Sequence, residues 1–217
     1  MNPDIFSPAG AAQVSRWIHF MAGVTWIGLL YYFNFVQGEY FKEATPDAKS
    51  DAVKKLAPRA LWWFRYGALL TFLSGVVILA LYGHPTRFWT FDITIGSLLG
   101  TLMFLNVWLI IWPNQKIVCG IVPGDAAAAG PKALLASRTN VLFSGPMLLF
   151  MGSSAHLSHG MLGSASSAAL GVCVAIIAAL ELNAIKGKLW PAIATVRGVI
   201  HCSIALAVVL WLVMSLL

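Results

Sequence analysis

Six long apolar runs divide the chain, and each is close to the length that an α-helix needs to cross the hydrocarbon core of a bilayer. They cover roughly Val14–Val36, Ala60–Tyr82, Ile93–Trp112, Thr139–Leu157, Ser167–Ile185 and Ala192–Leu217. Charged residues make up only 10% of the 217 residues, whereas a soluble domain carries about 25%. The sequence therefore predicts an all-α integral membrane protein, a bundle of six transmembrane helices that forms one domain over residues 1–217.

Basic residues are distributed unevenly between the two sides of the predicted bundle. One side carries Lys42, Lys49, Lys54, Lys55, Arg59, Arg65, Lys116, Lys132, Arg138, Lys186, Lys188 and Arg197, and the other carries Arg16 and Arg87. Because cytoplasmic loops are enriched in lysine and arginine, both termini are expected on the periplasmic side of a bacterial inner membrane. The first run is longer than a signal-peptide core, so it is expected to be retained. The basic residues form no continuous stripe, which argues against nucleic acid as a partner.

The first run carries an ionisable residue, His19, about one turn inside its start. Gly23 and Trp26 follow at helical spacing, so the three residues share one face, with a small residue one turn below the imidazole. An ionisable group within a membrane span is costly and is a candidate functional group. A histidine beside a glycine notch on a membrane helix can hold a flat macrocycle such as haem against the backbone.

The fourth run offers a second histidine at a similar depth. At 1.5 Å per residue, His156 lies about 25 Å from the cytoplasmic end of its helix and His19 about 8 Å from the periplasmic end, in a core about 30 Å thick. Gly145, Leu149 and Gly152 share the face of His156, and Pro146 can kink the helix. The pattern favours haem b with His19 and His156 as axial ligands of the iron. Helix packing through these histidines and glycines, another metal and a proton path remain alternatives.

Other polar residues are weaker candidates for the same site. His201 lies near the midplane and is interpreted as a satisfied core histidine, pairing with a group such as Asn106, with a second haem and a proton path as alternatives. His159 follows His156 by three residues, so the two could share a face, although an interfacial position is favoured. Arg65 is expected to reach the cytoplasmic interface or to pair with a haem propionate. We expect a solvated loop position for His84, an interfacial position for Glu181 beside Lys186 or Lys188, and close helix packing at Gly96 and Gly100.

Several short motifs occur together in the order found in one known family. They are Arg16-Trp-Ile-His19 with Thr25-Trp-Ile-Gly28, Leu61-Trp-Trp-Phe64 with Leu73-Ser-Gly75, Gly96-x-x-x-Gly100-Thr, Asn106-Val, Pro113-Asn-Gln-Lys116, Pro146 and His156. Over residues 14–160 the chain resembles the bacterial membrane-bound urate hydroxylase (urate oxidase N-terminal domain) family, as a short form without that family's cytochrome c domain. The resemblance implies haem at His19 and His156, urate oxidation to 5-hydroxyisourate, and electron transfer to a cytochrome.

Together these features predict a haem b-binding electron-transfer protein of the inner membrane. Its partners would be the lipid bilayer and a periplasmic cytochrome c or a respiratory complex, and it could form an oligomer. Urate oxidation with an external cytochrome c as acceptor is the enzymatic form of this prediction. The alternative is a non-redox accessory subunit of a larger membrane complex. A small transporter is less favoured, because only His201, Asn106 and Pro146 offer the polar or broken midplane that transporters use.

Overall fold

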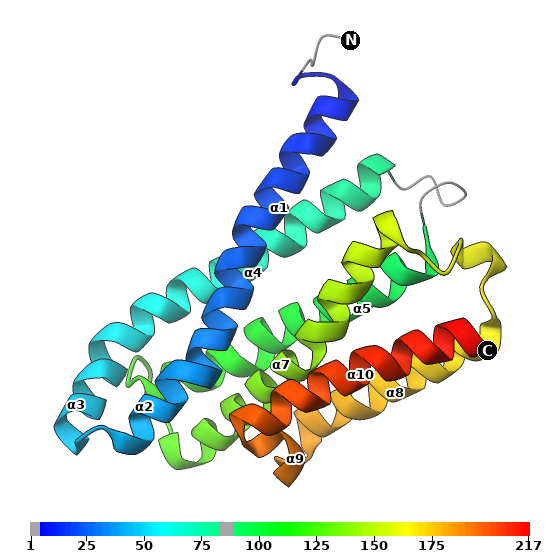
Figure 1. The fold of residues 1–217 in the computed structure, drawn as a ribbon. Helices are drawn as coiled ribbons and strands as arrows, with labels where there is room; N and C mark the ends of the chain where they lie inside the picture. The colour runs from blue at the N-terminus through cyan, green and yellow to red at the C-terminus, as the bar shows by residue number, and fades with distance from the viewer. Residues whose placement is uncertain (1–4, 83–88) are drawn as a thin grey trace.

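A computed structural model describes residues 5–82 and 89–217 of the chain. The fold of these residues is helical (Figure 1). One antiparallel bridge joins Thr90 and Met161. The helices, in chain order, are α1 (Pro8–Tyr31), η1 (Tyr32–Gln37), α2 (Gly38–Glu43), α3 (Pro46–Asp51), η2 (Ala52–Leu56), α4 (Ala57–Tyr82), α5 (Phe91–Leu105), η3 (Asn106–Ile111), α6 (Trp112–Val118), α7 (Ala126–His156), η4 (Leu162–Ser164), α8 (Ser167–Lys186), α9 (Pro191–Ala194) and α10 (Val196–Leu216). The segments η1, η2 and η3 are π-helical, and η4 is a 3₁₀ turn.

Side-chain caps explain where several of these helices begin. The Thr90 hydroxyl accepts from the Ile93 amide at the start of α5, and the Asp125 carboxylate accepts from the Ala127 and Ala128 amides at the start of α7. Ser166 and Thr195 cap α8 and α10 in the same way. Each cap satisfies an amide that has no partner within its own helix, which is worth about 1 kcal/mol per helix.

Five helical segments are long and apolar enough to cross a membrane: Pro46–Leu81, Phe91–Val118, Ala126–His156, Ser167–Lys186 and Val196–Leu216. Multi-pass membrane association and an all-helical fold are therefore supported. The first predicted span, α1, falls outside these five, because Arg16, His19 and several Gly, Thr, Trp and Tyr residues lower its mean hydropathy.

Most of the segment 113–138, which separates the third and fourth apolar runs, is helical. The helix that begins at Phe91 continues to Val118, and α7 already begins at Ala126. Pro113 lies inside this continuous helix, directly after the π-helical segment η3. Alanine has the highest helix propensity of any residue type, so the alanine tract after Asp125 favours a helix. Only residues 119–125 are left to connect the two helices.

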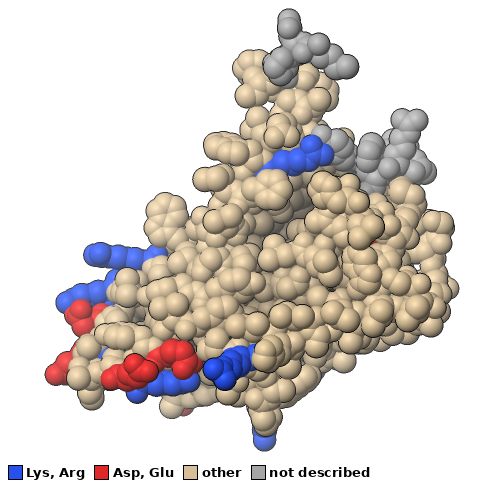
Figure 2. Space-filling view, in the orientation of Figure 1, with Lys and Arg blue, Asp and Glu red and all other residues tan. Residues whose placement is uncertain are grey.

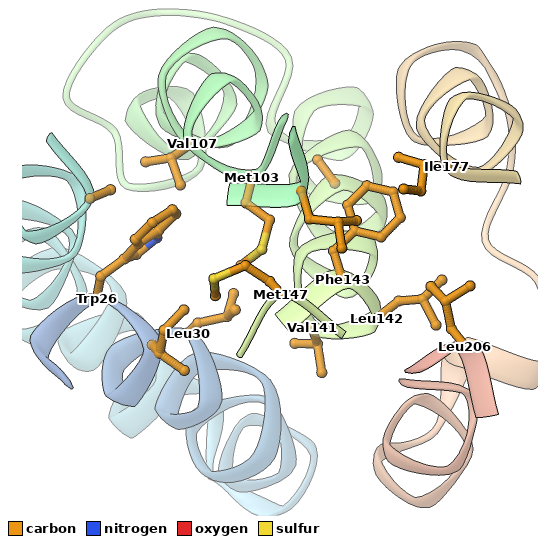
Figure 3. Close-up of a cluster of buried hydrophobic side chains, with 14 of the residues drawn as sticks. Trp26, Leu30, Met103, Val107, Val141, Leu142, Phe143, Met147, Ile177 and Leu206 are labelled. Atoms are coloured by element: carbon orange, nitrogen blue, oxygen red, sulfur yellow. The ribbon is translucent and has the colours of Figure 1, made fainter. Parts of the chain in front are cut away.

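Helix α7 is central to the bundle, since α1, η1, η3, α5, α6, α8 and α10 all contact it. In contrast, α1 packs mainly along α4. Toward the N-terminal end of α1, this helix diverges from the rest of the bundle (Figure 1). Trp26 and Leu30 of α1 meet Met103 and Met147 where this helix rejoins the bundle (Figure 3). Most buried residues of α1 therefore lie in its C-terminal half, and His19 lies near the middle of the helix.

Glycines bring α7 close to its neighbours, as the sequence predicts for Gly96 and Gly100. A Cβ at Gly96 would lie 3.1 Å from the Met151 backbone nitrogen, and one at Gly100 would lie 3.2 Å from Met151 Cε. A Cβ at Gly145 would clash with Ser203 Oγ of α10. The packing interpretation of Gly96 and Gly100 is confirmed.

Charged residues gather at the end of the molecule that contains α2 and α3, and most of the visible remainder is uncharged (Figure 2). Two exposed ion pairs, Lys42–Glu39 and Lys55–Asp51, lie in this region. The surface thus has one strongly polar end and a broad apolar band, as expected for helices that cross a bilayer.

Candidate functional site

His19 is held against α4 by its Nδ1 atom. The distance from Nδ1 to the Thr71 backbone oxygen is 2.8 Å, and the distance to Ser74 Oγ is 3.3 Å. A backbone carbonyl can only accept a hydrogen bond, so Nδ1 carries the proton and donates to Thr71. In the neutral ring the lone pair then belongs to Nε2, which is the arrangement that histidine ligands of metals adopt.

The surroundings of the His19 ring are made by small residues of both helices. A Cβ at Gly75 would lie 3.1 Å from His19 Cε1, so the glycine leaves the space that the imidazole occupies. A Cβ at Gly23 of α1 would lie 3.8 Å from the Thr71 methyl group, an ordinary van der Waals distance. The notch beside His19 is therefore filled largely by α4 itself.

Trp26 does not lie beside His19 in an open site, although the two share a helix. It is buried, with 2% of its surface exposed, and it points toward Val107 of η3 (Figure 3). Its Nε1–H group is buried and donates to no group among the described residues. Trp26 thus contributes to the packed core between α1 and η3.

His156 is the last residue of α7, and its side chain is exposed. Gly152, one turn earlier, is also exposed, and a Cβ there would meet nothing within 4 Å. Gly145, in contrast, faces Ser203 of α10, so that notch is occupied by protein. His19 is therefore half-buried against α4 near the middle of α1, whereas His156 is exposed at the C-terminal end of α7.

His159 belongs to a different network from His156, because α7 ends at His156 and the two histidines share no helical face. Its Nδ1 lies 2.9 Å from Asp92 Oδ1, and its backbone amide donates to Asp92 Oδ2 at 2.7 Å. Ser153 Oγ donates to the same carboxylate at 2.7 Å, and His159 Nε2 lies 3.0 Å from Ser215 Oγ. The fully buried Asp92 thereby joins the start of α5 to the ends of α7 and α10.

Replacing Asp92 by alanine is expected to lower the free energy of unfolding by about 3 kcal/mol, because buried donors on Ser153 and His159 would lose their acceptor. The apparent Tm of the purified protein in detergent measures the effect. Ser164→Ala, at an exposed hydroxyl that bonds only within its own turn, is the matched control. An unchanged Tm in Asp92→Ala would contradict the structural role of this network.

The remaining candidates lie elsewhere. His201 is exposed on α10, so its interpretation as a satisfied core histidine is wrong. The Arg65 guanidinium stacks over the Trp112 ring, with its carbon 3.9 Å from the ring centroid, which favours an aromatic contact over a propionate. His84 lies outside the described residues.

A buried polar cluster was missed by the sequence-based description. Asn106 Nδ2 lies 3.0 Å from both Asn140 Oδ1 and Glu181 Oε2, and Asn140 donates to the Met103 carbonyl at 2.9 Å. Glu181 is therefore buried and bound to Asn106, and its predicted interfacial position beside Lys186 or Lys188 is wrong, as is the pairing of Asn106 with His201. Asn106 begins the π-helix η3, and such a segment changes the face that a residue presents, so a helical projection of the sequence does not reveal this position.

Comparison with known proteins gives no identification of this chain. No family model, no curated protein and no solved structure matches it. Among the residues that the structure describes, no group of three or more His, Cys, Asp or Glu side chains is arranged to hold a metal ion. The geometry around His19 is therefore the strongest guide to function.

Proposed function

We propose that α1 is a sixth membrane span and that both termini lie on the periplasmic side of a bacterial inner membrane. Support comes from the long contact of α1 with α4, which leaves apolar side chains such as Phe20 and Val24 exposed along the other face of α1. The charged end of the molecule at α2 and α3 would then face the cytoplasm, in keeping with the positive-inside rule.

We further propose that the protein binds haem b, with His19 and His156 as axial ligands. The observation that carries this proposal is the hydrogen bond from His19 Nδ1 to the Thr71 carbonyl, because it leaves the Nε2 lone pair for a metal. His156 is exposed at the C-terminal end of α7, so its imidazole is accessible to serve as a second ligand. The donor set fits haem, since paired neutral imidazoles are common axial ligands.

The residues of this chain would act by holding and orienting that group. Thr71 fixes the proton at His19 Nδ1 and thereby sets the ring's tautomer, and Gly75 gives the imidazole room to lie against α4. Haem with two histidine ligands supplies one-electron transfer and has no open coordination position. The partner would be a periplasmic cytochrome c or a respiratory complex. The family resemblance adds urate as a candidate electron donor, for which urate-dependent reduction of added cytochrome c is the assay.

One observation favours the alternative, a non-redox accessory subunit. His201 lies about 8 Å along α10 from Val196, within an apolar span, and its side chain is exposed. Exposure of an ionisable group to lipid is costly, so a second membrane protein, or a second copy of this chain, would cover this face.

A visible spectrum of the protein purified from haem-replete cells tests the proposal. We expect a Soret band that shifts on reduction, and a pyridine haemochrome spectrum of haem b. A colourless protein that remains folded and monodisperse would contradict haem binding and leave the accessory subunit as the function.

A further inference from the structure

Three side chains with the chemistry of a nucleophile, a base and an acid are joined by hydrogen bonds where α10 ends. Ser215 Oγ lies 3.0 Å from His159 Nε2, and His159 Nδ1 lies 2.9 Å from Asp92 Oδ1. Ser215 belongs to α10, Asp92 to the first turn of α5, and His159 to the segment that follows α7. The packing of three separate parts of the chain therefore builds the order hydroxyl, imidazole and carboxylate, which activates a serine for attack on a carbonyl carbon.

Asp92 fixes the orientation of the imidazole and the atom that holds its proton. The carboxylate is fully buried, and it accepts from Ser153 Oγ and from the His159 backbone amide, each at 2.7 Å. It also accepts from His159 Nδ1–H, so in the neutral ring the Nε2 lone pair faces the Ser215 hydroxyl. That hydroxyl has two acceptors in range, Nε2 at 3.0 Å and the Trp211 carbonyl at 2.9 Å. A rotation of the hydroxyl is therefore enough to direct its proton at Nε2.

Ser215 is accessible, whereas the two groups behind it are shielded. The residue is exposed, and the side chains of His159 and Asp92 are 9% and 0% exposed. Ser215 lies in the last turn of a helix long enough to span a membrane, which places it at the boundary between lipid and water. Leu212 and Leu216, at the same end of α10, are exposed apolar side chains. A molecule that reaches the hydroxyl would therefore come from the bilayer surface and would carry an apolar chain.

We propose that Ser215 and His159, positioned by Asp92, hydrolyse a carboxylic ester of a membrane lipid. Ser215 Oγ would attack the ester carbonyl carbon as its proton moves to His159 Nε2, and that proton leaves with the alcohol while the acyl group stays on Oγ. Water then attacks the acyl carbonyl, one of its protons passes through Nε2 to Oγ, and the carboxylic acid departs. One ester and one water thus give one alcohol and one acid.

Trp211 is placed to support this reaction. It precedes Ser215 by one turn of α10, and its ring centroid lies 4.2 Å from that of His159 in an edge contact. The ring restricts the imidazole on one side, and its indole N–H would donate to the oxyanion that forms at the ester carbonyl. The reaction uses no residue proposed to hold haem, so it can be tested even on a colourless protein.

Labelling of the full chain in detergent with an alkyl fluorophosphonate, which bonds covalently to an activated serine, tests the proposal. Mass spectrometry of the labelled peptides should find the label on Ser215, and Ser215→Ala should remove it. Ser158→Ala deletes another exposed serine, next to His159 in the sequence, and should be labelled at the wild-type rate. A label on a different residue, or no label on folded wild-type protein, would overturn the site.

His159→Gln separates proton transfer from packing, because the amide can still bond to Asp92 but cannot take the serine proton as a base. We expect labelling to slow at least about a hundredfold, in a variant whose apparent Tm shows that it is folded. Ser215→Ala, at an exposed residue, remains decisive if His159→Gln does not fold. A wild-type labelling rate in folded His159→Gln would contradict the role of the imidazole.

The substrate class is tested with two para-nitrophenyl esters in mixed detergent micelles. We expect the wild type to release para-nitrophenolate from the octanoate at least about tenfold faster than from the acetate, because only the octanoate carries a chain that can lie along the apolar residues beside Ser215. Ser215→Ala should lose both activities. Equal rates with the two esters would overturn a lipid ester as the substrate.

Discussion

Substitution of His19 by alanine is expected to abolish the Soret band of the purified protein. The proposed iron would lose the ligand whose Nε2 lone pair is set by the 2.8 Å hydrogen bond from Nδ1 to the Thr71 carbonyl. His156→Ala should change the spectrum from a six-coordinate to a five-coordinate form or remove the haem altogether. Added imidazole should restore part of the band to His19→Ala, because it can occupy the space that the side chain leaves.

Two comparisons separate a ligand role from a general loss of structure. His201→Ala removes an exposed histidine of α10 and should leave the band at full intensity. Gly75→Leu keeps both histidines, but its Cβ alone would lie 3.1 Å from His19 Cε1, so the displaced ring should bind haem at least tenfold more weakly. Retention of the wild-type spectrum by His19→Ala would rule out His19 as an axial ligand.

His19 and His159 stand out in the sequence as ionisable residues in or beside apolar runs. Their hydrogen-bond partners, however, could not be predicted from it. His19 meets Thr71 across 52 residues of chain, and His159 meets Asp92 across 67. Such pairs depend on how the helices pack, about which hydropathy gives no information. The apolar runs, in contrast, located the helices well, because length and hydrophobicity decide whether a segment can cross a bilayer.

The buried polar cluster around Asn106 was missed for a related reason. Asn34 and Asn106 both belong to π-helical segments, where the wider turn changes which side chains face inward. A projection with 3.6 residues per turn therefore misplaces them.

Substitution of Gly96 by leucine is expected to lower the free energy of unfolding by about 3 kcal/mol or more, the largest effect that we expect from helix packing. Its Cβ would lie 3.1 Å from the Met151 backbone nitrogen and 3.4 Å from the Phe150 carbonyl carbon. Backbone atoms of α7 cannot move aside as a flexible side chain can, so α5 and α7 would have to separate. The separation would also disturb Asp92 and Ser153, which are joined across the same pair of helices.

Gly171→Leu is the matched control for this substitution. Gly171 lies inside α8 and is exposed, and a Cβ there would meet nothing within 4 Å. Both variants add the same apolar side chain to a glycine of a membrane helix, so only the contact with α7 distinguishes them. Apparent Tm in detergent should fall steeply for Gly96→Leu and stay near the wild-type value for Gly171→Leu. Equal stability of the two variants would mean that α5 and α7 do not approach as closely as the contact between Gly96 and the Met151 backbone requires. The hydrogen bonds of Asp92 across these helices would then need another explanation.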